Sequence, residues 1–317
     1  MTSFLTILYQ VLSLFLMMAV GVFVRKKQWV TNEVKQGLIQ LLIKIVSPAM
    51  IISSFMNEFE SEKAKNALIV FILTLTIHSA LALLSRFFFR KSARDQRPVL
   101  RYAVMFSNCA YMGYPVLQGI FGSEGVFFGA IYASCFHIFT WTFGVSIFGK
   151  REEKLGFFKT LRSVLSPATV ALLIGAVIFL LQLKLPVFIS TPIQTVGGMN
   201  TPVSMIILGA NLADVDFRTI LNNVRIYIVT AVKLVVIPLT ILAIFLLINL
   251  SGLLSLHGIA YKIALIEASM PTAAYTAILA GKYGADDRLA AGIVAFSTLC
   301  SILTLPLLIT LYQSCGI

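Results

Sequence analysis

Two short polar segments interrupt two long apolar stretches of the chain, and their residue types suit the binding of a small anion. The apolar stretch 99–121 is interrupted at 108–115, and the stretch 259–280 is interrupted at 269–275. Where a helix stops inside a membrane, the half-helix that follows presents free N–H groups and about half a positive charge, while the preceding half-helix presents free carbonyls. Such an end suits a carboxylate. Two interruptions that cross would therefore form a polar pocket for an anion.

Each interruption contains a proline that prevents a continuous helix from forming through it. Pro115 and Pro271 lack an N–H donor and disfavour helix at the residue before each. A single proline would favour a structural kink with locally capped backbone, whereas paired breaks in corresponding places favour a site. The residues assigned to substrate binding are the neutral groups Asn108, Cys109, Tyr111, Gly113, Pro115, Ser269, Pro271, Thr272, Tyr275 and Thr276, with Ser107 beside them.

Ionisable side chains inside apolar stretches are costly, which makes each a functional candidate. Glu267 lies within one turn before the second interruption and can exchange a proton or pair with a lysine. Lys44 and Lys233 can attract the anion or neutralise Glu267. An internal ion pair is the alternative for all three. His78 and His137 are interpreted as packing residues.

A sodium site is a further alternative. It would need several oxygens, which Asn108, Asn200, Thr201, Asn211 and the freed carbonyls can provide, but no intramembrane Asp accompanies them. Uniport, proton coupling and sodium coupling therefore stay open. Asn200 and Asn211 join Glu267 and the two lysines as candidates for coupling or gating.

No enzymatic motif appears in the chain. It has no hydrolytic triad, phosphate loop or metal cluster. Its cysteines, Cys109, Cys135, Cys300 and Cys315, have neither metal-type spacing nor a disulfide framework. We therefore expect no catalytic activity, no bound metal and no cofactor.

Composition places the chain in a bilayer. Of its 317 residues, 58% are hydrophobic and only 12% are charged, and the mean hydropathy is +0.92. This leaves too little polar surface to cover a soluble globule. The net charge of +12 comes from short loops between apolar segments, so it indicates membrane topology and anionic lipid rather than nucleic acid.

Hydropathy divides the chain into ten segments of about 20 residues, the length that crosses a hydrocarbon core of about 30 Å. The first is taken as a membrane helix because residues 1–3 carry no basic residue of a signal peptide. Nothing remains for a soluble domain. The predicted spans are 5–24, 36–55, 66–88, 99–121, 125–149, 165–184, 190–212, 225–249, 258–281 and 289–312.

Basic residues concentrate in alternate turns, which the positive-inside rule places in the cytoplasm. These residues are Arg25, Lys26, Lys27 and Lys35; Arg86, Arg90, Lys91, Arg94, Arg97 and Arg101; Lys150, Arg151, Lys154, Lys159 and Arg162; Arg218 and Arg225; and Lys282 and Arg288. The opposite side holds Lys63, Lys65, Lys184, Glu58, Glu60 and Glu62. We therefore expect a multi-pass inner-membrane protein with both termini on the non-cytoplasmic side.

An internal repeat predicts two inverted halves. A shift of 162 residues places Gly119 over Gly281 and Gly122 over Gly284, and the two interruptions then correspond. A shift of 154 places 47–48 (Ser-Pro) over 201–202 (Thr-Pro). Because each half has five segments, an odd number, the second half enters from the opposite side. The expected fold is an all-α integral membrane domain with a 5+5 inverted repeat. Residues 1–149 and 165–317 form its halves, 150–164 form a cytoplasmic linker, and discontinuous helices 4 and 9 cross.

Two motifs resemble a known family. The segment Phe106-Ser-Asn108-Cys-Ala-Tyr-Met-Gly113-Tyr-Pro115 resembles the Asn-x-x-[Phe/Tyr]-Met-Gly-x-Pro signature of the auxin efflux carrier (AEC) family, and 270–284 is similar to its ninth-helix signature. The resemblance implies a ten-helix transporter of organic anions such as auxin, malate or malonate. The short central loop indicates a compact bacterial-type member, similar to malate or malonate permeases. Tyr275 stands where the family often has Asn, so substrate identity does not carry over.

These observations predict a secondary active transporter of a small organic anion, a carboxylate, that works by alternating access. The alternatives are a sodium-coupled symporter of the bile acid transporter type and an anion channel. A sensor would normally bring a soluble output domain, which the chain lacks. The expected partners are the substrate and the bilayer, with a proton or sodium ion and a homodimer left open. The sequence leaves the substrate, the direction of transport and the oligomer undetermined.

Overall fold

A computed structural model describes residues 4–56, 60–149, 165–216, 218, 220, 222–252 and 256–316. Within these ranges the regular structure is helical, apart from one isolated antiparallel β-bridge between Ser107 and Thr272. Some residues used in the sequence analysis lie outside the described ranges: Glu58, and the linker 150–164 with Lys150, Arg151, Lys154, Lys159 and Arg162.

Six helical spans in the described ranges are long and apolar enough to cross a membrane. They are Phe4–Lys26, Asn32–Ser54, Ser61–Ser85, Cys109–Phe148, Val224–Leu250 and Asp287–Ser314, and a shorter apolar helix covers Pro167–Leu180. The prediction of an all-helical, multi-pass membrane protein is therefore confirmed. The ten-helix count with a 5+5 repeat stays a prediction.

The first part of the chain forms the elements α1 (Phe4–Lys26), α2 (Asn32–Leu41), η1 (Leu42–Val46), α3 (Ser47–Ser54), α4 (Ser61–Ser85), α5 (Gln96–Met105), η2 (Cys109–Gly113), α6 (Tyr114–Phe139), η3 (Thr140–Gly144) and α7 (Val145–Phe148). The predicted fourth span covers α5, η2 and the start of α6. Inside α6, Gly122 has φ +62° and ψ −147°, a conformation that L-residues rarely adopt. Gly122 thus separates the predicted fourth and fifth spans.

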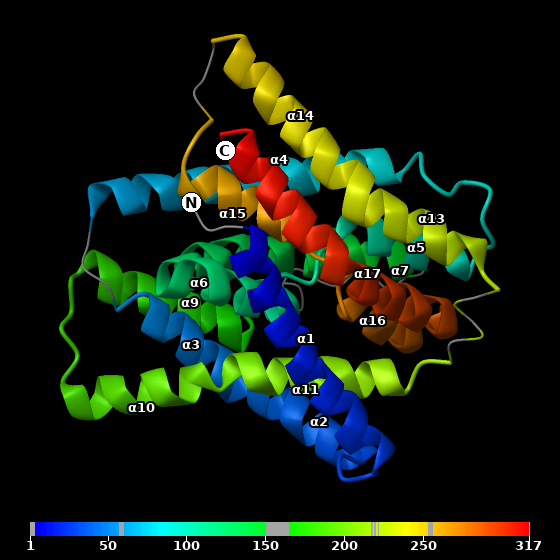
Figure 1. The fold of residues 1–317 in the computed structure, drawn as a ribbon, viewed down its shortest axis with the longest axis horizontal. Helices are drawn as coiled ribbons and strands as arrows, with labels where there is room; N and C mark the ends of the chain where they lie inside the picture. The colour runs from blue at the N-terminus through cyan, green and yellow to red at the C-terminus, as the bar shows by residue number, and fades with distance from the viewer. Residues whose placement is uncertain are drawn as a thin grey trace.

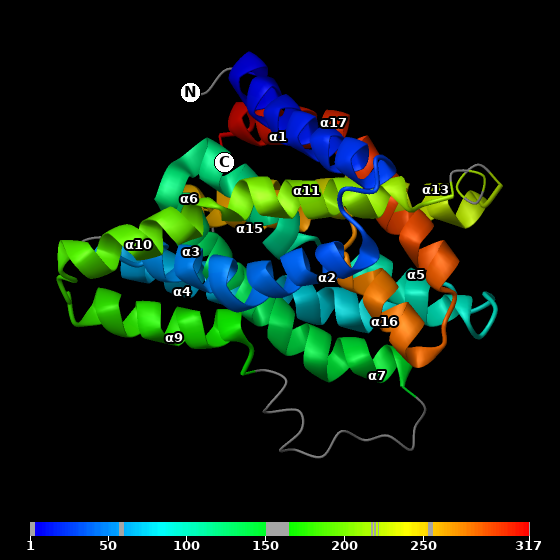
Figure 2. The same cartoon turned by 90° about the horizontal axis from the view of Figure 1, so that it is seen from below.

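The second part forms α9 (Pro167–Leu180), α10 (Val187–Gly198), α11 (Asn200–Ala213), α13 (Val224–Ala231), η4 (Val232–Val236), α14 (Ile237–Leu250), α15 (Ile259–Ala268), α16 (Tyr275–Tyr283) and α17 (Asp287–Ser314). The second interruption separates α15 from α16. The start of α1 and the end of α17 lie near each other in two perpendicular views (Figures 1 and 2).

The elements η1 to η4 are π-helical turns, and three of them have the same local cause. Each of η1, η2 and η4 ends two residues before a proline, namely Pro48, Pro115 and Pro238. A proline cannot donate to the carbonyl four residues back, and its ring clashes with that carbonyl. A widened turn is one way for a helix to accommodate the lost bond. The prolines therefore place the local distortions, including the one at the first break.

Helices fall into two groups by their contacts. We call α1, α2, α3, α9, α10 and α11 the α1/α11 group, because α1 packs along α11 and α3 packs on α9 and α10. The crossing group contains α4 to α7 and α13 to α17. In the α1/α11 group, a Cβ on Gly209 would meet the carbonyl oxygen of Met18, so glycine allows α1 and α11 to approach closely. The groups meet where α1 contacts α6 and α17, and where α3 and α9 contact α6.

Candidate functional site

The two interruptions cross and pair through their backbones. The N–H of Asn108 donates to the carbonyl of Pro271 at 2.7 Å, and the N–H of Ala273 donates to the carbonyl of Phe106 at 3.0 Å. Backbone groups freed by the breaks are thus satisfied within the protein, as a low-dielectric membrane interior requires. The predicted crossing of the two broken helices is present in the structure as a two-bond antiparallel pair.

Side-chain hydroxyls complete the crossing. Thr272 donates its hydroxyl to the carbonyl of Ala103 at 3.1 Å, and its N–H donates to the Ser297 hydroxyl at 3.2 Å. Ser107 donates to the carbonyl of Ala268, the last residue of α15, at 3.3 Å. The hydroxyls of Ser107 and Thr272 therefore bind protein backbone and hold the two breaks together.

Lys233 in η4 lies at the same place. Its ammonium donates to the Ser107 hydroxyl at 2.6 Å and to the Ala268 carbonyl at 3.4 Å, and the residue is 0% exposed. The carbonyl end of a helix carries partial negative charge, which a cation stabilises. In the described part of the chain no carboxylate lies within 4.0 Å of Lys233. Its partners are the end of α15 and the first break.

Glu267 is fully buried at the end of α15, and neither of its carboxylate oxygens has a hydrogen-bond partner among the described residues. The carboxyl group lies against backbone. A Cβ on Gly113 would lie 2.5 and 2.6 Å from the two carboxylate oxygens, and a Cβ on Gly129 would lie 3.3 Å from one of them. These two glycines therefore make the space that Glu267 occupies. Lys44, in contrast, is exposed on η1.

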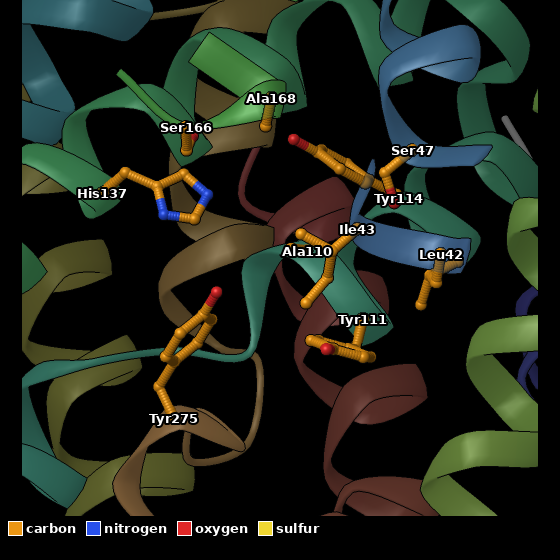
Figure 3. A pocket seen from close by; sticks show the side chains of 10 residues that line it. All are labelled: Leu42, Ile43, Ser47, Ala110, Tyr111, Tyr114, His137, Ser166, Ala168 and Tyr275. Carbon is orange, nitrogen blue, oxygen red and sulfur yellow. The ribbon is translucent and has the colours of Figure 1, made fainter. Parts of the chain in front are cut away.

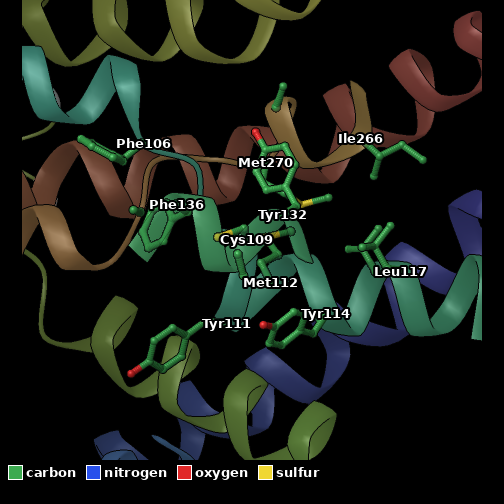
Figure 4. Close-up of a cluster of buried hydrophobic side chains, with 14 of the residues drawn as sticks. Phe106, Cys109, Tyr111, Met112, Tyr114, Leu117, Tyr132, Phe136, Ile266 and Met270 are labelled. Atoms are coloured by element: carbon green, nitrogen blue, oxygen red, sulfur yellow. The ribbon is translucent and has the colours of Figure 1, made fainter. Parts of the chain in front are cut away.

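Most of the predicted binding residues are buried in the crossing itself. Figure 4 shows Cys109, Met112 and Tyr132 packed together beside it, whereas the hydroxyl of Tyr111 points out of this cluster. The side-chain amide nitrogen of Asn108 and the hydroxyl of Thr276 are buried without a partner in the described structure. The residues of the predicted set that line none of the three cavities described below are Asn108, Cys109, Gly113, Ser269, Pro271, Thr272 and Thr276.

A main cavity of about 590 Å³ reaches the crossing from one side. Tyr111 of the first break and Tyr275 of α16 form its inner end, with Trp141 packed edge-on against Tyr275. Asn211 also lines it. The polar groups Gln36, Gln40 and Thr298 line its walls, and its charged lining residues are Lys35 and Asp214.

The two charged residues of the main cavity belong to an ion-pair cluster. Arg25 contacts one carboxylate oxygen of Asp214 at 2.7 Å, and Lys35 contacts the other at 2.6 Å. Partial burial opposes ionisation of Asp214, but the hydrogen bonds from Arg25 and Lys35 outweigh it and hold the pKa of this carboxyl below its usual value. The cluster joins the end of α1, the start of α2 and the end of α11.

A smaller cavity of about 40 Å³, which we call the chamber, lies beside the first break. It shares Tyr111 and Tyr275 with the main cavity. Figure 3 shows the imidazole of His137 facing the hydroxyl of Tyr275, and the hydroxyl of Tyr114 directed toward Ala168 at the start of α9. Sequence reasoning treated His137 as a packing residue. Its position in this chamber depends on the packing of separate segments, and no local motif marks it.

His137 and Ser166 give the chamber its polar character. His137 is 7% exposed, and its Nδ1 has no hydrogen-bond partner within the described ranges. Ser166 caps α9 by accepting a hydrogen bond from the N–H of Thr169 at 3.2 Å. His78 differs, because its Nδ1 bonds the Thr74 carbonyl at 2.9 Å and its ring stacks on Phe139. The structure places His78 in packing, as the sequence indicated.

The remaining candidates lie elsewhere. Asn200 accepts a hydrogen bond from the Ser47 hydroxyl at 2.8 Å, which joins the kink before α11 to the one before α3. Pro115 lines a third cavity of about 180 Å³, together with Gln10 of α1 and Thr201 of α11. Thr201 and Asn211 belong to opposite ends of α11, so the third cavity and the main cavity approach the crossing from different ends of that helix.

Comparison with known proteins identifies the family. A model of the family described as membrane transport protein matches residues 6–309. The chain is 27% identical over 308 residues to an uncharacterized transporter of Methanothermobacter thermautotrophicus, a match that covers 94% of this chain and 95% of that protein. It is also 27% identical over 307 residues to an uncharacterized transporter of Methanocaldococcus jannaschii, with 94% and 96% covered. The chain therefore belongs to the membrane transport protein family, the auxin efflux carrier-like family whose motifs its two breaks resemble.

Proposed function

We propose that the protein is a secondary active transporter that carries a small organic anion, with carboxylates as the substrate class, by alternating access. The observation that carries this proposal is the main cavity, whose inner end is formed by one tyrosine from each break, Tyr111 and Tyr275. Its volume of about 590 Å³ lies within the range of about 300–1,000 Å³ that small-molecule sites occupy.

The chamber offers a place for the anionic group of the substrate. Ser166 marks the N-terminus of α9, where free N–H groups and the helix dipole favour negative charge. The unpartnered Nδ1 of His137 and the hydroxyls of Tyr114 and Tyr275 add neutral hydrogen-bonding groups. About 40 Å³ exceeds the roughly 10–15 Å³ that one water needs. In this proposal the carboxylate enters the chamber and the rest of the substrate occupies the main cavity.

Contacts between helices support the proposed 5+5 inverted repeat. The packing of α1 on α11 has a counterpart in that of α9 on α3, and the contact of α5 with α16 has a counterpart in that of α15 with α6. Gly122 and Gly284, which the repeat superposes, have φ values of +62° and +66° and end corresponding half-helices. Ten transmembrane segments in two inverted halves account for this pairing.

Orientation follows from charge. The main cavity contains Lys35, and its turn is cytoplasmic by the positive-inside rule, so in this proposal the cavity opens to the cytoplasm. The third cavity, at Pro115, then lies on the outer side of the crossing. A reporter fused after residue 317 should be periplasmic, and one inserted at 150–159 should be cytoplasmic. If the two reporters were on the opposite sides, the proposed orientation would be wrong. If both were on the same side, the ten-helix count would be wrong.

Coupling is proposed to a proton rather than to sodium. Glu267 is buried without a hydrogen-bond partner in the described structure, and an ionised carboxylate is costly in such a place. This is the environment in which a carboxyl group binds and releases a proton as its surroundings change. Two of the residues considered for sodium lie in different places: Asn200 bonds Ser47, whereas Asn211 lines the main cavity.

Counterflow in proteoliposomes tests the proposed function. Purified protein is reconstituted with an unlabelled carboxylate inside, and uptake of the labelled compound is measured for acetate to hexanoate and for malonate to adipate. At least one series member should exchange through the wild type. Ala291→Trp fills the main cavity and should abolish exchange, whereas Leu303→Trp, at a position 67% exposed on the same helix, should not.

Each alternative has its own signature. Exchange through Ala291→Trp at the wild-type rate would show that the main cavity is not the route. If none of the carboxylates exchanged, the proposal that carboxylates are the substrate class would be wrong. Bilayer current far above carrier turnover would identify an anion channel, and uptake that depends on a sodium gradient would favour the bile acid transporter type of mechanism.

A further inference from the structure

The turn between α4 and α5 is the most basic segment of the described chain. Together with the start of α5 it contains Arg86, Arg90, Lys91, Arg94, Arg97 and Arg101, with Asp95 as the only acidic residue. Figures 1 and 2 both place this turn, drawn in cyan, at one end of the molecule, where it projects beyond the neighbouring helices. The positive-inside rule accounts for basic residues here, but it does not account for how they are arranged.

Three of the guanidinium groups converge without a counter-charge. Arg86 follows the last residue of α4, while Arg97 and Arg101 lie one turn apart on α5. Arg86 and Arg97 both act on Arg101 by like-charge repulsion. None of the three has a carboxylate within 4.0 Å among the described residues. Within the described ranges the fold therefore brings positive charges together and places no carboxylate against them.

Arg101 is the innermost member of this group, which we call the arginine cluster (Arg86, Arg97 and Arg101). One terminal nitrogen donates to the hydroxyl of Ser85, the last residue of α4, at 3.3 Å. Its Nε is buried and has no partner in the described structure. Buried donors of this kind are normally satisfied, and a guanidinium fork fits a phosphate group well.

Neighbouring aromatic side chains indicate where the anion comes from. Phe87 and Phe88 are 65% and 40% exposed just beyond the end of α4. The guanidinium of Arg90 lies 4.7 Å from the centre of the Phe87 ring, and its Nε donates to the carbonyl of Arg86 at 3.1 Å. Exposed rings beside basic groups are typical of a segment that lies in the headgroup region of a bilayer.

Three other basic groups at helix ends have partners within the protein. Arg25 and Lys35 share Asp214, and Arg225 donates to the side chain of Gln96, which in turn donates to Asp286. Each of those groups has a partner supplied by the protein. The arginine cluster is set apart by the buried Nε of Arg101, since no other Lys or Arg of the described chain has a buried side-chain nitrogen without a partner, and exposed aromatic rings lie beside it.

We propose that the arginine cluster binds the phosphate of an anionic phospholipid whose acyl chains lie along Phe87 and Phe88. The lipid phosphate neutralises the repulsion and joins the end of α4 to the start of α5. Since α5 leads directly to the first break, the bound lipid holds the entry to the crossing in place. This site is separate from the substrate site, and it does not depend on the proposed function.

Lipid titration of the purified full chain tests this site. Thermal unfolding is followed in neutral detergent micelles or phosphatidylcholine nanodiscs as phosphatidylglycerol is added. The double variant Arg97→Gln, Arg101→Gln is compared with Lys26→Gln, Lys27→Gln, which removes the same charge from two exposed lysines at the end of α1. Inorganic phosphate added without phosphatidylglycerol distinguishes a lipid site from a free-anion site. Native mass spectrometry counts the bound lipid.

Phosphatidylglycerol should stabilise the wild type and the lysine variant alike, and the arginine variant should need at least tenfold more lipid for half of the effect. In phosphatidylcholine alone the arginine variant should be as stable as the wild type, because removing two arginine charges relieves the repulsion within the cluster. If both double variants lost the stabilisation by phosphatidylglycerol equally, the effect would depend on overall charge alone, and the proposed lipid site would be wrong. Full stabilisation by inorganic phosphate would overturn the assignment to lipid.

Discussion

The crossing and the two cavities beside it are built from the same two breaks but satisfy their polar groups in opposite ways. In the crossing, backbone groups and the hydroxyls of Ser107 and Thr272 bind one another, and Lys233 covers the carbonyl end of α15. In the chamber, His137 has a buried nitrogen without a partner in the described structure. The comparison indicates that the crossing is a fixed support, whereas the cavities present the groups that are available to a ligand.

Glu267 is the charged exception on the crossing side, where the Asn108 amide nitrogen and the Thr276 hydroxyl also lack a partner in the described structure. It is buried as deeply as Lys233, but its carboxylate oxygens have no partner within the described ranges. A support would not normally include a costly, unsatisfied acid. We propose that Lys233 is a structural charge and Glu267 a functional one, and the predictions below test this proposal.

The largest effect is expected from removing the charge that supports the crossing. Lys233→Met leaves the Ser107 hydroxyl and the Ala268 carbonyl without their cationic donor, and hydrogen bonds to charged groups contribute about 1.5–3 kcal/mol each. We expect the free energy of unfolding to fall by about 3 kcal/mol and counterflow to be abolished. Lys44→Met is the matched control, since this exposed lysine also lies in a π-helical turn before a proline. Equal damage from both substitutions would contradict the supporting role of Lys233.

Glu267→Gln should affect coupling rather than folding. Glutamine keeps the size of the side chain and cannot carry a proton as a carboxyl group does. Substrate exchange should persist, while uptake driven by a proton gradient should fall about tenfold or more, within the usual range of coupling between two ligands. The two modes are measured side by side in proteoliposomes with the melting temperature as control. Gradient-driven uptake equal to wild type would sink the coupling role of Glu267.

Gly113→Ala should show how tightly Glu267 is held. The added methyl would lie 2.5 Å from a carboxylate oxygen, and overpacking of this kind costs about 1–3 kcal/mol. Gly119→Ala is the control, because its nearest neighbour would be at 3.8 Å. In a Glu267→Ala background the cost of Gly113→Ala should largely disappear, which a double-mutant cycle of unfolding free energies measures. An unchanged cost there would contradict the contact.

The smallest effect is expected at the charged end of the main cavity. The pKa of Asp214 is lowered in the folded protein, so its ionised form stabilises the fold above the ordinary carboxyl pKa of about 4. This contribution is lost as the pH falls through the lower folded-state value. An exposed ion pair contributes about 1 kcal/mol or less. Melting temperatures from about pH 6 to pH 3 should fall less steeply for Asp214→Asn than for wild type, and an equally steep fall would contradict this role of Asp214.

Several features of the fold could be predicted from sequence because they depend on local chemistry. Polar residues and prolines inside membrane-length apolar stretches indicate breaks, and Pro115 and Pro271 do lie in the two breaks that cross. Membrane location follows from composition, and the fourth- and ninth-segment motifs are sufficient to indicate the family, which comparison confirmed. All of these features can be read within one segment at a time.

Residue roles within the breaks could not be predicted in the same way. Asn108 and Tyr111 are three residues apart in one motif, yet the structure buries Asn108 in the crossing and places Tyr111 at the end of the main cavity. The direction in which each side chain points depends on the widened turn η2 and on its pairing with the second break, far away in sequence. His137 reaches the chamber for a similar reason, because four other segments of the chain line that cavity with it.

Membrane insertion, the two broken helices and family membership all follow from the amino-acid sequence. Which polar residues hold the crossing and which face a cavity depends instead on tertiary packing. Lys44 and Lys233 illustrate the limit, since each is a lone lysine in an apolar segment shortly before a proline, yet one is exposed and the other fully buried. Whether a side chain is buried depends on which face of its helix is covered by other helices. Those helices are distant in sequence, so a local sequence pattern does not reveal them.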